Sequence, residues 1–97
     1  MPTYVTLANF TDQGIRNYSD TAKRAKAFEE MVEEMGGQVK EIVWTMGMYD
    51  VVAITELPDD ETATAGALKM SSLGNVRTTT LRGFGMEEIS SIIEKAG

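Results

Sequence analysis

The amino-acid sequence predicts an α+β fold of the ferredoxin-like class: a four-stranded antiparallel sheet, two helices on one of its faces and a short C-terminal helix. Three observations predict it. Stretches with strand character and stretches with helical periodicity follow one another in the order β-α-β-β-α-β, which is the split βαβ motif. Right-handed crossovers place both long helices on the same face. The chain has 97 residues, of which 42% are hydrophobic and 25% charged, so we expect residues 1–97 to form one domain.

The first half of the predicted fold is a strand followed by an amphipathic helix. In residues 3–9, β-branched and aromatic side chains alternate with small polar ones, as is typical of a strand. Residues 11–14, Thr-Asp-Gln-Gly, predict a turn or loop. We expect the helix to begin near Ser19 or Asp20, whose side chains can accept bonds from the first turn, and to end at the glycines 36–37. Its apolar stripe, at spacings of three and four, consists of Ala25, Phe28, Val32 and Met35.

A β-hairpin follows this helix. Residues 39–45 and 49–55 are rich in β-branched residues, and only Met-Gly-Met separates them. Gly47 suits the tightest point of the connection, because glycine adopts backbone conformations that other residues avoid.

The second half of the predicted fold contains a helix, a strand and a final helix. Residues 57–61, Leu-Pro-Asp-Asp-Glu, place acidic side chains near the positive end of the second long helix, which ends at residues 73–75. Residues 76–82 form a threonine-rich strand, and residues 86–95 the short helix. The apolar residues of the two helices are Ala63, Ala67 and Met70 in the first, and Ile89, Ile92 and Ile93 in the second.

The two strands of the hairpin carry apolar residues on both of their sides. Sheets with one face in water have strands in which apolar and polar residues alternate. In the first strand, Ile42, Trp44 and Met46 lie on one side and Val43 lies on the other. In the second, Val52 and Ile54 lie on one side, and Val51 and Ala53 lie on the other. We therefore expect another subunit to cover the second face, most simply in a twofold homodimer or a higher homo-oligomer. The alternative is an open sheet with some exposed apolar groups.

The composition excludes several classes of chemistry. The chain contains neither cysteine nor histidine, which removes thiolate catalysis, the usual zinc sites, Ser-His-Asp triads and haem ligation by histidine. The net charge of −6, with few clustered basic residues, argues against nucleic acid as a partner. There is no signal peptide pattern and no apolar run that would span a membrane, so we expect a cytoplasmic protein without membrane contacts. We expect no cofactor and no metal.

One run of residues resembles a known family. Residues 47–54, Gly-Met-Tyr-Asp-Val-Val-Ala-Ile, resemble the GYD domain, which is named for the glycine, tyrosine and aspartate at this hairpin. Residues 4–7, 58–61 and 73–78 support the resemblance, which extends over nearly the whole chain. It implies a ferredoxin-like fold of the dimeric α/β-barrel kind. It implies no established activity.

Asp50 and Tyr49 are the first candidate site residues. A carboxylate at the start of an apolar strand needs a partner or water, because burying an unpaired charge is costly. Asp50 is therefore either a general base or a structural group that accepts backbone N–H bonds or pairs with Arg77 or Arg16. The ring of Tyr49 either packs, or its hydroxyl orients a ligand.

Three further residues are candidates for ligand binding. Trp44 either lines a pocket or fills a subunit interface. Arg77 precedes three threonines, and a guanidinium beside hydroxyls can bind a carboxylate or phosphate; the alternative is an edge strand kept polar against aggregation. Arg16 lies in a polar segment that either closes over one end of the sheet or forms a solvated loop.

Two functions fit these observations. The first is a homo-oligomeric module that binds a small metabolite or serves in regulation or assembly. The second is a cofactor-independent isomerase or oxygenase acting on a small acidic or aromatic compound, with Asp50 as base, Tyr49 as donor, and Arg16 or Arg77 as the anion clamp. The second rests on analogy of fold, which is weak support for a function.

Overall fold

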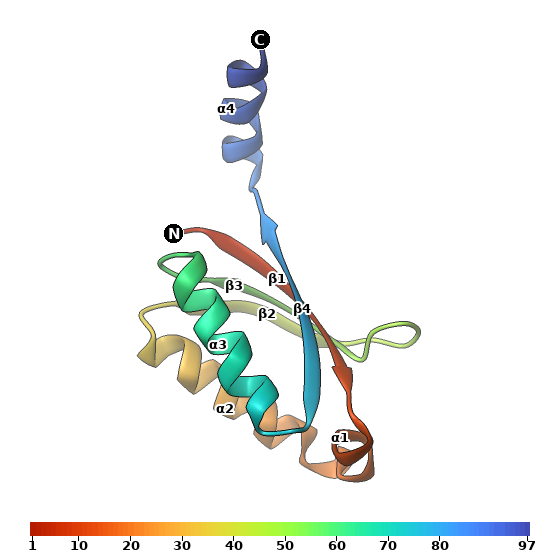
Figure 1. Ribbon diagram of the computed structural model, residues 1–97. Coiled ribbons are helices and arrows are strands. Elements are labelled where there is room, and N and C mark those ends of the chain that lie inside the picture. Colours follow the sequence, from red (N-terminus) through yellow and green to blue (C-terminus); the bar gives the residue numbers. More distant parts are fainter.

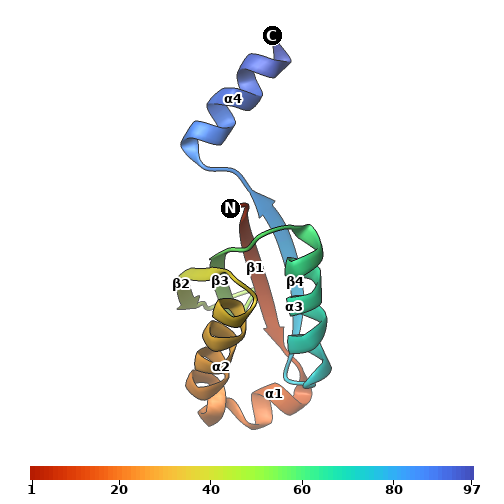
Figure 2. The same cartoon turned by 90° about the vertical axis from the view of Figure 1, so that its left-hand side faces the viewer.

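Four antiparallel strands form one sheet, and two long helices lie side by side over one of its faces (Figures 1 and 2). The computed structural model describes residues 1–97. The strands are β1 (Thr3–Phe10), β2 (Gln38–Trp44), β3 (Val51–Glu56) and β4 (Val76–Gly83), in the order β2-β3-β1-β4. The helices over the sheet are α2 (Thr21–Glu34) and α3 (Asp60–Ser72). The predicted ferredoxin-like class is confirmed.

The segment after β1 differs from its prediction. Residues predicted as a turn form a short helix, α1 (Asp12–Arg16), which is followed by one turn of 3-10 helix, η1 (Tyr18–Asp20). Thr11 makes this helix possible, because its Oγ1 accepts a bond from the Gly14 N–H at 3.0 Å. Such short polar helices lack the apolar periodicity by which a sequence indicates a helix.

Gly14 of α1 lies against the turn that precedes β4. A Cβ atom at this position would lie 2.0 Å from the backbone oxygen of Asn75, so no larger residue fits without movement of the backbone. The same oxygen accepts the Thr11 N–H at 3.0 Å. These contacts tie the start of α1 to the start of β4.

The core lies between the sheet and the two long helices. Its buried residues are Tyr4, Met31, Val32, Leu57 and Ala63, and Phe28, Met35, Val39 and Met70 pack against them. The stripes predicted for both helices therefore face the sheet. The α3 helix begins with the side chain of Asp59, whose Oδ1 accepts the Thr62 N–H at 2.8 Å.

The C-terminal helix α4 (Met86–Ala96) extends beyond the end of the sheet, away from the other helices (Figure 1). No residue of α4 is buried. The side chain of Glu88 fixes its start, because Oε1 accepts the Gly85 N–H and Oε2 lies 3.3 Å from Nη2 of Arg82. None of the helices has the length and apolar character needed to cross a bilayer.

Candidate functional site

The face of the sheet that points away from α2 and α3, here called the open face, is not covered by any element of the chain. Side chains alternate between the two faces of a strand. Alternate residues of β1, from Tyr4 to Phe10, face the long helices, so Val5 and Leu7 lie on the open face. In β2, Ile42 and Trp44 face the helices. The apolar residues found on both sides of the hairpin strands are therefore divided between the two faces.

The open face has an apolar centre. Two rows of side chains cross the sheet there, defined by the pairing of the strands. In the first row Val5 lies between Ile54 and Leu81. In the second, Leu7 lies beside Val52 on one side and Thr79 on the other. The apolar band, as we call this centre, comprises Val5, Leu7, Val43, Val52, Ile54 and Leu81.

Polar side chains lie at both ends of the apolar band. At the end near the β2–β3 loop, Asn9 pairs with Arg77, and the Asn9 amide donates to the Met48 oxygen at 2.6 Å. At the other end, Thr3 pairs with Glu56, whose carboxylate lies 3.8 Å from the Lys40 amine. An apolar centre with a polar rim is the usual anatomy of a protein–protein interface.

The outer members of the band are open to solvent. Val43 on β2 is 42% exposed and Leu81 on β4 is 48% exposed. Isolated exposed apolar residues are ordinary on protein surfaces. A continuous band across all four strands is a different feature, because patches of this kind mark binding surfaces.

Asp50 lies at the junction of the β2–β3 loop with the sheet. Its Oδ2 accepts the backbone N–H of Phe10 at 2.8 Å, and its own N–H donates to the Ala8 oxygen at 2.9 Å. Neither Arg77 nor Arg16 bonds to its carboxylate. Asp50 therefore extends the pairing of β1 with β3 beyond Val51, the first residue of β3.

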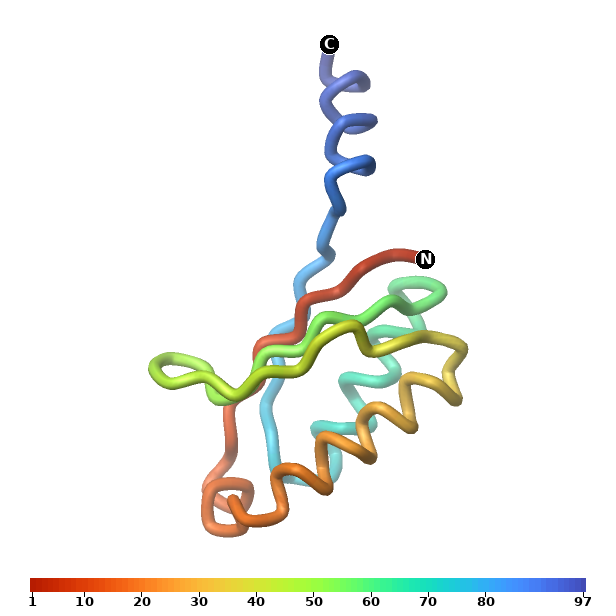
Figure 3. The backbone as a smooth tube through the Cα atoms, turned by 180° about the vertical axis from the view of Figure 1, so that it is seen from behind, coloured from red at the N-terminus to blue at the C-terminus, as the bar shows by residue number.

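The remainder of the loop is held by short polar contacts. The hydroxyl of Thr45 donates to the Tyr49 oxygen at 2.5 Å, and Gly47 at the tip has a φ of 103°, which only glycine adopts readily. The loop extends away from the sheet and the helices (Figure 3). Tyr49 is half-buried, and Met46 and Met48 beside it are exposed.

The structure separates the five predicted site residues. Asp50 and Arg77 lie in the polar row at one end of the open face, in line with Asn9. Trp44 lies on the opposite face, where its Nε1 donates to the Thr21 hydroxyl at the start of α2, at 2.9 Å. Arg16 is exposed at the end of α1, and Tyr49 is in the loop.

Sequence reasoning missed part of the open face. It inferred a covered second face from the hairpin strands alone, although β1 contributes Val5 and Leu7 and β4 contributes Leu81. The sequence of β1 did contain a signal, because large side chains alternate onto both faces of this strand. Only the strand pairing shows which of the two faces the helices cover.

Tyr4 is the ionisable group that its surroundings change most. Burial, followed by the hydrogen bond that its hydroxyl donates to Asp60 Oδ1 at 2.6 Å, raises the pKa of Tyr4 to about 12. At exposed positions, bonds to Thr62 lower the pKa of Asp59. The Gly85 N–H, and after it Arg82, lowers the pKa of Glu88.

The strand order, the two helices on one face and the open apolar face define a ferredoxin-like protein with a surface suited to binding another protein. The family model of the GYD domain matches residues 4–93. The chain belongs to the GYD domain family, and the resemblance found in its sequence is confirmed.

Two matches from Thermus thermophilus are similar to this chain. The glutamine synthetase and cystathionine beta-lyase binding protein is 32% identical over 82 residues, which are 84% of this chain and 86% of that protein. The crystal structure of TTHA0845 matches with a TM-score of 0.56 at 30% identity and covers 88% of this chain and 95% of that one.

Proposed function

We propose that this chain is a non-catalytic assembly module that forms a homodimer through its open face and binds metabolic enzymes in the cytoplasm. The apolar band carries the proposal, because six apolar side chains on four strands have no cover within the chain. Burying such a band is favourable in proportion to the apolar area removed from water, by about 25 cal/mol for each Å².

A twofold arrangement brings the apolar bands of two copies together. Both ends of the apolar band carry charges of both signs: Arg77 and Asp50 at one end, and Glu41 and Glu56 toward the other, with Lys40 beside Glu56. If the twofold axis runs across the strands, each end of one face meets the opposite end of its copy. The two apolar bands then coincide. Sheets packed in this manner lie about 10 Å apart.

Analytical ultracentrifugation of the full chain tests the self-association. Wild type should sediment with twice the 10.6 kDa chain mass. Leu81→Glu places a charge in the apolar band and should give a monomer. Leu68→Glu is the matched control, because Leu68 on α3 is 68% exposed and lies outside the open face; this variant should remain dimeric.

Two results would contradict the homodimer. One is a monomeric wild type at about 100 µM, a concentration at which interfaces of standard size are occupied. The other is an equal loss of dimer in both leucine variants, which would show that any added acid disrupts the protein.

The proposal that this chain binds enzymes rests on the relative that is named for binding glutamine synthetase and cystathionine beta-lyase. Purified enzymes of these two kinds, from the organism that supplies this chain, should bind immobilised wild type in biolayer interferometry. Absence of binding to both would overturn this part of the proposal and leave the self-association standing.

A further inference from the structure

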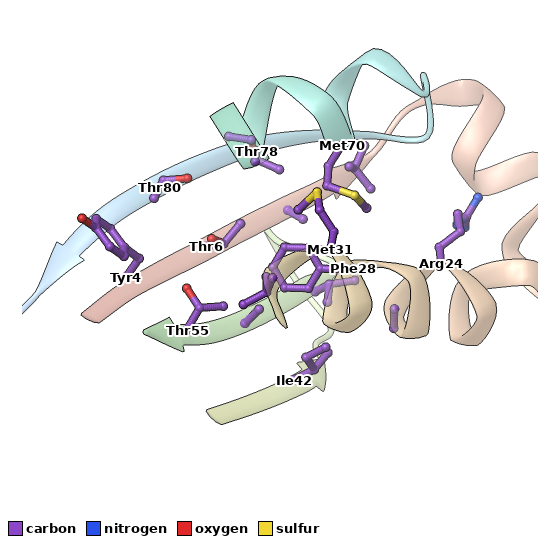
Figure 4. A pocket seen from close by; sticks show the side chains of 18 of the residues that line it. Tyr4, Thr6, Arg24, Phe28, Met31, Ile42, Thr55, Met70, Thr78 and Thr80 are labelled. Carbon is purple, nitrogen blue, oxygen red and sulfur yellow. The ribbon is translucent and has the colours of Figure 1, made fainter. Parts of the chain in front are cut away.

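A pocket of about 100 Å³ lies between the sheet and the two long helices, on the opposite side of the sheet from the open face (Figure 4). We call it the interlayer pocket. Its helix side is apolar and adaptable: Phe28 and Met31 come from α2, and Met70 from α3. The residues that α3 presents to the pocket include very small ones. Gly66 lies opposite Met31, and Ala63 and Ala67 flank it.

The sheet side of the pocket carries hydroxyl groups. Thr6 on β1 pairs directly with Thr80 on β4, and Thr78 of β4 and Thr55 of β3 also line the pocket. Figure 4 shows these side chains on the strands that face Phe28 and the methionines. Trp44 and Thr21, which also line the pocket, bond to each other, whereas neither the Thr6 nor the Thr80 hydroxyl makes a hydrogen bond within the chain. The hydroxyls of Thr6 and Thr80 are thus available to a ligand.

Arg24 is the one charged residue among those that line the pocket. Arg24 lies at one end, where its Nη2 donates to the Gly14 oxygen at 3.3 Å and its guanidinium lies 5.5 Å from the centre of the Phe10 ring. Tyr4 lies at the other end, and its hydroxyl donates a hydrogen bond to Asp60. An ionised ligand between them would lose its hydration without gaining an opposite charge, which is costly.

We propose that the interlayer pocket binds a small neutral aromatic molecule with one hydroxyl group, that is, a simple phenol. The ring lies against Phe28, Met31 and Met70, and the hydroxyl bonds to Thr6 and Thr80. This proposal is independent of the proposed self-association, which uses the other face of the sheet.

Size and chemistry both favour this class. A cavity of about 150 Å³ in another protein holds benzene, so a pocket of about 100 Å³ accepts one six-membered ring with slight movement of its walls. Methionine side chains change conformation readily, and their sulfur atoms make favourable contacts with aromatic rings. A phenol stays neutral at pH 7, because its pKa lies near 10.

The seven methionines of the chain provide the measurement. In full-length protein labelled with ¹³C at the methionine methyl groups, phenol is titrated to about 10 mM. The signals of Met31, Met35 and Met70, which line the pocket, should shift and saturate. The signals of the exposed Met1, Met46, Met48 and Met86 should not move. Benzoate, the charged counterpart, should cause no shift.

Paired variants locate the ligand. Thr80→Val should weaken phenol binding about fivefold, the usual loss for one hydrogen bond, and leave benzene binding unchanged. Thr79→Val, on the open face of the same strand, is its control and should bind phenol as wild type does. Ala67→Leu fills the pocket and should abolish binding of both ligands, whereas Ala65→Leu on the exposed side of α3 should not.

Each contrary outcome overturns the proposal. Wild type without a saturable shift at 10 mM phenol shows that the pocket takes no such ligand. Equal binding by Thr80→Val and wild type shows that the Thr80 hydroxyl lacks the part in recognition that the proposal requires. Tighter binding of benzoate shows that a charge is recognised. Because Thr80→Val preserves the shape of the side chain, its result stands even if Ala67→Leu folds poorly.

Discussion

Asp50 is held by the backbone of β1 rather than by a cation. Its carboxylate accepts the Phe10 N–H at 2.8 Å. A polar group that loses its partner inside a protein costs about 1–3 kcal/mol. Asp50→Ala should therefore lower the free energy of unfolding by about 2 kcal/mol, whereas Asp50→Asn, which keeps an acceptor oxygen, should lower it by about 1 kcal/mol or less. Urea unfolding of both variants measures these losses.

A different result would restore the catalytic hypothesis for Asp50. A carboxylate that acts as a general base loses this activity when it is replaced by an amide, even if the variant protein is as stable as wild type. Suppose that Asp50→Asn is as stable as wild type and lacks an activity that the wild type has. Asp50 then has a catalytic role in addition to its structural role at the β2–β3 loop.

Tyr4 makes the stability of the fold depend on pH in the alkaline range. Its pKa is about 12 in the folded chain and 10.0 ordinarily, chiefly because the ring is buried. Since the folded chain resists ionisation, the stabilisation is complete below pH 10 and disappears as the pH rises toward 12. The difference in unfolding free energy between wild type and Tyr4→Phe should therefore shrink across this interval, as followed by circular dichroism in urea. A constant difference from pH 8 to pH 12 would contradict the assignment.

Among the elements, α4 differs from the other α-helices in having no buried residue. Ile89, Ile92 and Ile93 are 43%, 38% and 63% exposed, and an isolated helix of this length is marginal in water. In the monomeric Leu81→Glu background, Ile92→Ala should therefore change the free energy of unfolding by less than about 0.5 kcal/mol.

Met31→Ala supplies the comparison for α4, because Met31 is only 7% exposed in the core. Loss of a buried methionine costs about 2–5 kcal/mol. If Ile92→Ala costs as much as Met31→Ala in the monomeric background, α4 packs against the body of its own chain in solution. A cost confined to the dimeric wild type would instead place α4 on the partner.

At the scale of the whole molecule, the open face makes stability a function of concentration. Binding between folded copies stabilises the folded state by mass action. The Tm of wild type should rise by several degrees between about 2 µM and 200 µM, whereas that of Leu81→Glu should stay constant. Differential scanning calorimetry at the two concentrations decides this, and equal Tm values for wild type would contradict the homodimer.

The sequence by itself determined the class of fold and most of the elements. The apolar stripe of α2, the acidic start of α3 and the Gly-Met-Tyr-Asp hairpin are local patterns, and local patterns fix local structure. The family could also be recognised from the sequence, because its signature is a short contiguous run at residues 47–54. The short helix α1 was missed, because Thr11 acts as its cap without any periodic signal nearby.

Only the tertiary structure decided which residues share a surface. The candidate residues Arg16, Trp44, Tyr49, Asp50 and Arg77 lie on different faces and elements, whereas Val5, Leu7 and Leu81 join the hairpin residues in one band. Thr6 and Thr80 lie near opposite ends of the sequence and pair directly. The pairing of distant strands depends on the register of the whole sheet, and no short window of sequence contains it.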